Sequence, residues 1–156
     1  MTTAVASSNI ALAKYWGKRE HGHNLPAVPS LSVTLAGLSL AECREVGEGL
    51  AEVVRASEEP VLLVASTDMS HYISADEAAT LDGMALARVQ ALDPEGLYRT
   101  VRSHQISMCG VLPTTAALFA ARALGASQAE LVRYGNSGEQ SGDHDRVVGY
   151  AGVLVR

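Results

Sequence analysis

Apolar residues fall into two alternating patterns from residue 39 onward, and this alternation constrains the fold more than any other feature. Leu40, Cys43 and Val46 begin a stripe with the three- and four-residue spacing of a helix. Residues 61–65 instead form a continuous apolar run, which is typical of a strand buried on both faces. Because segments of the two kinds alternate along the chain, we predict an α/β fold with a mixed sheet flanked by helices.

Capping residues and turn formers place the element boundaries. Ser39 followed by Glu42 is a capping-box pattern, which predicts the start of a helix that ends near Ser57. Gly125 predicts the end of another helix that starts near Leu112. The other predicted elements are strands at 2–6 and 31–36 joined by a polar loop, a helix capped by Ser74 or Asp76 that runs to about Leu92, a short helix opened by Asp93-Pro94-Glu95, a strand or helix end at 131–134, a Gly-, Ser- and Asp-rich loop at 136–145 and a strand at 147–155.

Composition narrows the class of protein. The 156 residues fit one domain, and a hydrophobic content of 47% suffices for a core. The net charge of −5 and the lack of a Lys- or Arg-rich run predict that nucleic acid is not a partner. No apolar run reaches the roughly 18–20 residues that span a membrane, and the N-terminus shows no signal-peptide pattern. We therefore expect a cytoplasmic protein that does not engage a membrane.

Asp68 and His71 come directly after the predicted strand at residues 61–65. In open α/β sheets ligands bind beyond the carboxyl ends of strands, so both side chains are candidate catalytic residues. A histidine three residues after an aspartate can be oriented by that carboxylate or can bind a metal. The structural alternative is that Asp68 caps a turn and His71 packs beside it.

Cys109 precedes Gly110 and a predicted apolar helix. The positive end of a helix dipole favours the thiolate, which is both a nucleophile and a soft metal ligand. Together with Asp68 and His71, Cys109 can form a Cys/His/carboxylate site that is either metal-bound or nucleophilic. The alternative is a small buried hydrophobe, which is how we interpret Cys43 on its helical stripe.

Two further polar segments have open interpretations. Tyr15, Lys18 and Arg19 form a basic loop that can bind phosphate, or that is simply solvated. Residues 143–145, Asp-His-Asp, can line the same crevice as Asp68, or they form a tight exposed connection.

Several motifs from residue 64 to residue 151 occur in a characteristic order: Val64-Ala65-Ser66-Thr67-Asp68-Met69-Ser70-His71-Tyr72, Met108-Cys109-Gly110, Tyr134-Gly135-Asn136-Ser137-Gly138 and Val147-Val148-Gly149-Tyr150-Ala151. With these motifs, residues 41–156 resemble the C-terminal part of the Memo family, also called AmmeMemoRadiSam system protein B. The resemblance implies a fold like that of class III extradiol dioxygenases. It also implies that Asp68 and His71 are pocket residues, that His71 and Cys109 are metal ligands, and that the metal is iron or copper.

The Memo pocket also uses histidines from the N-terminal half of that family, and no matching motif precedes residue 41; His21 and His23 lie in no such motif. The resemblance therefore implies a partial metal or redox pocket, a vestigial non-haem oxidoreductase-like site without full catalytic activity. It also implies self-association, or a partner that covers the missing half. A non-enzymatic interaction module is the corresponding alternative function.

Residues 4–38 carry a different pattern. Ser8-Asn9-Ile10-Ala11-Leu12-Ala13-Lys14-Tyr15-Trp16-Gly17-Lys18-Arg19, followed by Leu25-Pro26 and by residues 29–35, resembles the N-terminus of diphosphomevalonate decarboxylase, a member of the GHMP kinase superfamily. The resemblance implies that Tyr15 and Lys18 contact the diphosphate of a phosphorylated isoprenoid precursor. Because the family's ATP phosphate loop has no counterpart here, we expect no decarboxylase activity. The predicted organisation is a fusion of residues 1–38 with a Memo-like domain at 39–156.

Overall fold

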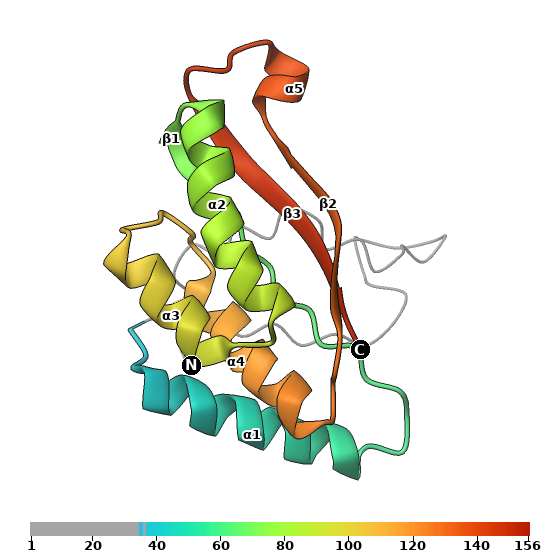
Figure 1. Cartoon of the computed structure of the whole chain (residues 1–156). Coiled ribbons are helices and arrows are strands. Elements are labelled where there is room, and N and C mark those ends of the chain that lie inside the picture. The colour runs from blue at the N-terminus through green and yellow to red at the C-terminus, as the bar shows by residue number, and fades with distance from the viewer. Residues whose placement is uncertain (1–34, 36) are drawn as a thin grey trace, which may run out of the picture. The chain divides into compact units, whose positions relative to one another are not determined.

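Helices and a small antiparallel sheet form the part of the chain that the computed structural model describes, residue 35 and residues 37–156 (Figure 1). The elements in chain order are α1 (Leu40–Ala56), β1 (His71–Ile73), α2 (Ala75–Gln90), α3 (Pro94–Ser103), α4 (Val111–Ala123), β2 (Ala129–Asn136), α5 (Gly138–Ser141) and β3 (Val147–Val155). The predicted combination of helices and strands is therefore confirmed for these residues. The two predicted N-terminal strands and the loop between them lie outside the described residues.

The sheet has the strand order β1-β3-β2, with β3 in the centre. Both pairings are antiparallel: His71 lies opposite Val148, and Tyr134 lies opposite Ala151. The prediction of a mixed sheet is wrong for the described residues. One reason is that β2 and β3 are joined by a short connection around α5, which returns the chain in the opposite direction.

The apolar run at residues 61–65 is not the buried strand that the sequence predicts. It belongs to no helix or strand, and the side chains of Leu62 and Val64 are 77% and 60% exposed. A strand buried on both faces needs neighbouring strands and a covering layer, and no described residue forms a β-ladder with this run. Its composition meets the requirement for such a strand, but its surroundings among the described residues do not.

The helix boundaries follow the predicted caps. The Ser39 hydroxyl accepts the Glu42 N–H at 3.3 Å, and the Glu42 carboxylate accepts the Ser39 N–H at 2.7 Å. Hydrogen bonding of the Glu42 carboxylate with the side chain and the backbone N–H of Ser39 lowers the pKa of Glu42. Ser74, rather than Asp76, caps α2, and Asp93 caps α3. Gly125 follows α4 with a φ of +94°, a left-handed conformation that glycine adopts without strain.

The structure also tests the predictions for residues 131–155. The segment at 131–134 is part of strand β2 and not the end of a helix. The predicted loop at 136–145 contains one helical turn, α5, which ends at Gly142 in a left-handed conformation. The predicted strand at 147–155 is confirmed as β3.

The core lies between α2, α3, α4 and the sheet. Its buried members are mostly aliphatic: Met69, Ala85, Leu86, Val89, Leu97, Val101, Ile106, Met108 and Leu118. Helix α1 packs against α4, where Cys43 is fully buried as predicted, and this burial raises the pKa of its thiol. No helix in the described part of the chain has the length and apolarity to cross a membrane.

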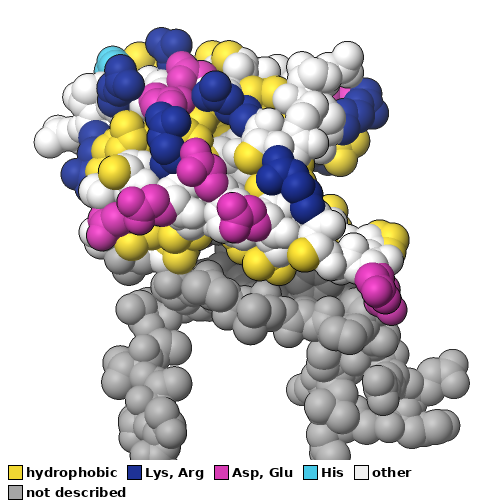
Figure 2. All heavy atoms as spheres, turned by 90° about the horizontal axis from the view of Figure 1, so that it is seen from below, with side chains coloured by type: hydrophobic (Ala, Val, Ile, Leu, Met, Phe, Trp, Pro, Cys, Tyr) yellow, Lys and Arg dark blue, Asp and Glu magenta, His cyan; other side chains and the backbone are white. Residues whose placement is uncertain are grey.

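Acidic and basic side chains intermingle on the face seen from the side of α1 (Figure 2). Glu95 of α3 pairs with Arg44 of α1 at 2.6 Å and with Arg122 of α4 at 3.3 Å. These ion pairs link three helices at the surface. Because both arginine side chains are about half exposed, each pair contributes at most about 1 kcal/mol.

Candidate metal site

The three site residues predicted from the sequence come together in the structure. One ligand atom from each of Asp68, His71 and Cys109 lies within 4.8 Å of the other two. Asp68 Oδ2 is 3.6 Å from His71 Nε2. Asp68 and His71 flank the start of β1, whereas Cys109 comes from the loop before α4. We call these three residues the Asp–His–Cys group.

The backbone around Asp68 and His71 is held by the central strand. The Met69 N–H donates to the Gly149 carbonyl at 2.9 Å, and the Gly149 N–H donates to the Ser70 carbonyl at 2.9 Å. These two bonds attach the segment before β1 to the central strand of the sheet. The segment that carries two of the three polar side chains is therefore fixed by non-local pairing.

Ser107 sets the orientation of the His71 ring. His71 donates its backbone N–H to Ser107 Oγ at 2.8 Å, and its Nδ1 lies 2.7 Å from the Ser107 carbonyl oxygen. Because a carbonyl oxygen only accepts, Nδ1 must carry a proton. The other ring nitrogen, Nε2, then faces the Asp68 carboxylate with room for either a proton or a metal cation between them.

Two polar groups lie near the sulfur of Cys109. The Asp68 N–H donates to Sγ at 3.3 Å, and Thr67 Oγ1 lies 3.8 Å from it. Cys109 is exposed, so the interpretation of this residue as a small buried hydrophobe is wrong. The exposed sulfur at the start of α4 can therefore serve as a ligand for a soft metal ion.

A hydrogen bond between Thr67 and Gly110 joins the segment before β1 to the loop before α4. The Gly110 N–H donates to Thr67 Oγ1 at 2.8 Å. A Cβ on Gly110 would lie 2.4 Å from the Thr67 Cβ, so only glycine permits this approach. Sequence reasoning did not assign roles to Thr67 or Ser107. Their only signal was adjacency to Asp68 and to the Met108-Cys109-Gly110 motif.

The other candidate residues either lie outside the described part of the chain or belong to a segment that is not part of the group. Tyr15, Lys18, His21 and His23 lie outside the described residues. The segment 143–145 is an exposed connection, in which the Asp145 N–H donates to Asp143 Oδ1 at 3.0 Å. The structure thus favours the second interpretation of this segment.

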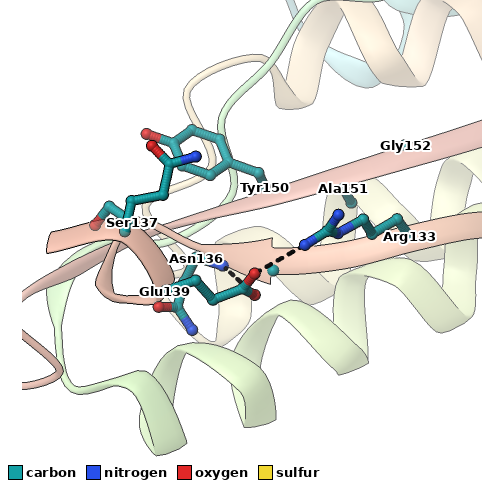
Figure 3. Close-up of a pocket in the computed structure, with 9 residues that line it drawn as sticks. Arg133, Asn136, Ser137, Glu139, Tyr150, Ala151 and Gly152 are labelled. Carbon is teal, nitrogen blue, oxygen red and sulfur yellow. Dashed lines mark hydrogen bonds and ion pairs between the residues drawn. The ribbon is translucent and has the colours of Figure 1, made fainter. Parts of the chain in front are cut away.

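A shallow cavity of about 410 Å³ lies elsewhere, over β2, β3 and α5 (Figure 3). Arg133 pairs with Glu139 across it at 2.9 Å, and the second Glu139 oxygen accepts the Asn136 N–H at 3.2 Å. Asp68, His71 and Cys109 are not among the residues that line this cavity. Its most prominent charged groups already neutralise each other, so it offers no clear charge for a ligand.

The comparison with protein families settles the ancestry of the chain. The family model described as "Memo-like protein" matches residues 24–154. The chain belongs to the Memo family. The resemblance predicted from residues 41–156 is thus confirmed, and the match begins within the segment for which the sequence predicts a resemblance to diphosphomevalonate decarboxylase.

Curated relatives agree with this family. A MEMO1 family protein of Methanopyrus kandleri is 40% identical over 136 residues, which are 87% of this chain and 47% of that protein. One from Methanosarcina mazei is 40% identical over 71% of this chain and 42% of its own length. One from Aquifex aeolicus is 36% identical over 80% of this chain and 46% of its own length. The chain spans about half the length of the curated relatives it matches.

Proposed function

We propose that this Memo-like protein binds a metal ion through His71 and Cys109, with Asp68 as the third member of the site. The observation that carries the proposal is the approach of the three ligand atoms to within 4.8 Å of one another. Ligands of one metal lie about 3–4 Å apart, since metal–ligand bonds measure about 2.0–2.3 Å. The ligand atoms therefore need to approach one another by up to about 2 Å to close on an ion.

The donor set fits iron or copper, the metals that the family resemblance implies. Imidazole and thiolate are ligands for both, and a carboxylate offsets the positive charge of the ion. Such an ion would supply redox or Lewis-acid chemistry at this site. Two residues of the chain take part. Ser107 directs Nε2 of His71 toward Asp68, and His71 must release any proton on Nε2 when the ion binds.

We propose metal binding, rather than turnover, as the activity of these residues. The described part of the chain offers three candidate ligands of mixed type, and a dioxygenase-like architecture is what family membership suggests for the whole domain. Both cysteines are free thiols, which suits the reducing cytoplasm that we propose as the location.

The test is metal content after anaerobic dialysis against Fe²⁺ or Cu⁺. We expect wild-type protein to retain close to one ion per chain, and His71→Ala and Cys109→Ser to lose most of it. His104→Ala and Cys43→Ala are the matched controls, because they remove an exposed histidine and a buried thiol outside the group. Unchanged metal content in Cys109→Ser would reject the proposal.

The decarboxylase-like alternative is not favoured, because the Memo match covers residues 24–154. Binding of a phosphorylated isoprenoid precursor by Tyr15 and Lys18 stays a prediction from the sequence.

Self-association is a second proposal, favoured by the apolar run at residues 61–65. Val61, Leu62 and Val64 are 46%, 77% and 60% exposed, and a second copy of the chain would remove them from water. We expect light scattering to show that the mass of the wild-type protein rises with concentration. The Leu62→Glu variant should instead stay monomeric. Val53→Glu is the control, because Val53 is 68% exposed on α1. A wild-type protein that stays monomeric at all concentrations would exclude this proposal.

A further inference from the structure

Asp82 of α2 is a fully buried carboxylate outside the Asp–His–Cys group. Its Oδ1 accepts the backbone N–H of Ser70 at 2.9 Å, and its Oδ2 accepts the hydroxyl of Tyr134 at 2.8 Å. No basic side chain pairs with it among the described residues. Burial of a carboxylate without a cation is costly, so the contacts that this side chain makes need an explanation.

The hydrogen bond from Ser70 connects Asp82 to the candidate metal site. Ser70 lies between Asp68 and His71, and its side chain is also fully buried. The Ser70 carbonyl accepts the Gly149 N–H at 2.9 Å, so the residue is held from β3 on one side and from α2 on the other. Asp82 of α2 and Gly149 of β3 thus hold, from two sides, the segment that carries two of the three candidate ligands, and we call this pair of contacts the clamp.

Gly149 and Tyr134 adapt the sheet to this carboxylate. A Cβ on Gly149 would lie 2.1 Å from Asp82 Oδ2, so the carboxylate packs directly against the backbone of β3. Tyr134 reaches Asp82 from β2. Burial and the contact with Asp82 raise the pKa of Tyr134 well above its usual range, which keeps the phenol protonated as a donor.

We infer that Asp82 is a positioning residue that fixes the segment from Asp68 to His71 in the geometry required for metal binding. The inference rests on the proposed function, but its first consequence concerns the metal-free protein. Without an acceptor at position 82 the Ser70 N–H is left unpaired in the core, and the segment must move to satisfy it. The contact of His71 with Ser107 then loosens.

The experiment compares Asp82→Ala with Asp82→Asn. An asparagine oxygen still accepts the Ser70 N–H, and its amide can donate to the Tyr134 oxygen, so this variant should restore the clamp. Leu97→Ala is the control for stability, because Leu97 is fully buried in the core on α3 and has no polar side-chain atom that could take part in the clamp. Ser70→Ala is the control for the contact itself, because it keeps the backbone N–H and removes a hydroxyl that has no partner among the described residues.

The first measurement is the ¹⁵N spectrum of the His71 imidazole in metal-free protein. We expect a single tautomer protonated at Nδ1 in wild type, Asp82→Asn, Ser70→Ala and Leu97→Ala, and mixed tautomers in Asp82→Ala. The second is Co²⁺ affinity, followed by the thiolate-to-cobalt absorption. Asp82→Ala should bind Co²⁺ about 10–100-fold more weakly, the usual effect of removing a support behind the ligands.

The outcomes separate the two proposals. If wild-type protein takes up no Co²⁺, the proposed function fails, while the His71 spectrum still judges the role of Asp82. A wild-type spectrum in Asp82→Ala, or an equal loss of affinity in Leu97→Ala, would overturn the inference. If Asp82→Ala does not fold, Gly149→Ala displaces the same carboxylate by steric overlap, and a wild-type His71 spectrum in that variant would overturn the inference as well.

Discussion

Replacement of Gly47 by alanine is expected to lower the free energy of unfolding by about 1–3 kcal/mol, the usual cost of an overpacked contact. Gly47 lies where α1 crosses α4. A Cβ there would sit 2.5 Å from the Ala116 carbonyl oxygen and 2.6 Å from the Phe119 Cβ. Because a backbone atom cannot rotate away, the two helices must separate. Urea unfolding followed by circular dichroism measures the loss.

Gly49→Ala is the matched control on the same helix. Nothing lies within 4 Å of a Cβ at Gly49, and alanine favours a helix interior over glycine by about 0.8–1.0 kcal/mol. The two substitutions are therefore expected to change stability with opposite signs. If Gly47→Ala also stabilises the protein, the close packing of α1 on α4 is contradicted.

The helices could be predicted from the sequence because their signals are local. Ser39 with Glu42, Asp93 with Pro94, and Gly125 each determine the conformation of residues within one turn of themselves. The structure uses each of these signals as a cap or an end. The choice between Ser74 and Asp76 could not be made in advance, because both are good caps two residues apart.

The sheet was harder to predict, because strand pairing is non-local. The run at residues 61–65 has the composition of a buried strand, yet no described residue pairs with it and Val61, Leu62 and Val64 are exposed. Strand β3 was predicted with its observed bounds, but its position between β1 and β2 depends on partners far away in the sequence. Burial on both faces is a property of neighbours, which composition does not specify.

The candidate site was predictable in its residue types and not in its supports. Asp68, His71 and Cys109 stand out because carboxylate, imidazole and thiolate are the groups that bind metals. Ser107 and Asp82 do not stand out, because their importance comes from contacts 36 and 12 residues away along the chain. A buried aspartate in the middle of α2 has no distinctive sequence pattern, so only the fold reveals it.

Replacement of Gly110 by alanine is expected to weaken Co²⁺ binding about tenfold or more, the scale seen when a support behind metal ligands is removed. A Cβ at Gly110 would lie 2.4 Å from the Thr67 Cβ and 2.8 Å from the Ser66 carbonyl oxygen. The overlap must push the loop before α4 away from residues 66–68, which breaks the 2.8 Å bond from Gly110 N–H to Thr67 Oγ1. Cys109 then moves away from Asp68 and His71.

The control is Gly83→Ala on α2, because nothing lies within 4 Å of a Cβ at that exposed glycine. It should leave Co²⁺ affinity unchanged and stabilise the helix by about 0.8–1.0 kcal/mol. Gly110→Ala should lose both affinity and about 1–3 kcal/mol of stability, since it overpacks a contact that also anchors α4. Wild-type Co²⁺ affinity in Gly110→Ala would mean that the approach of the two loops does not determine how His71 and Cys109 meet.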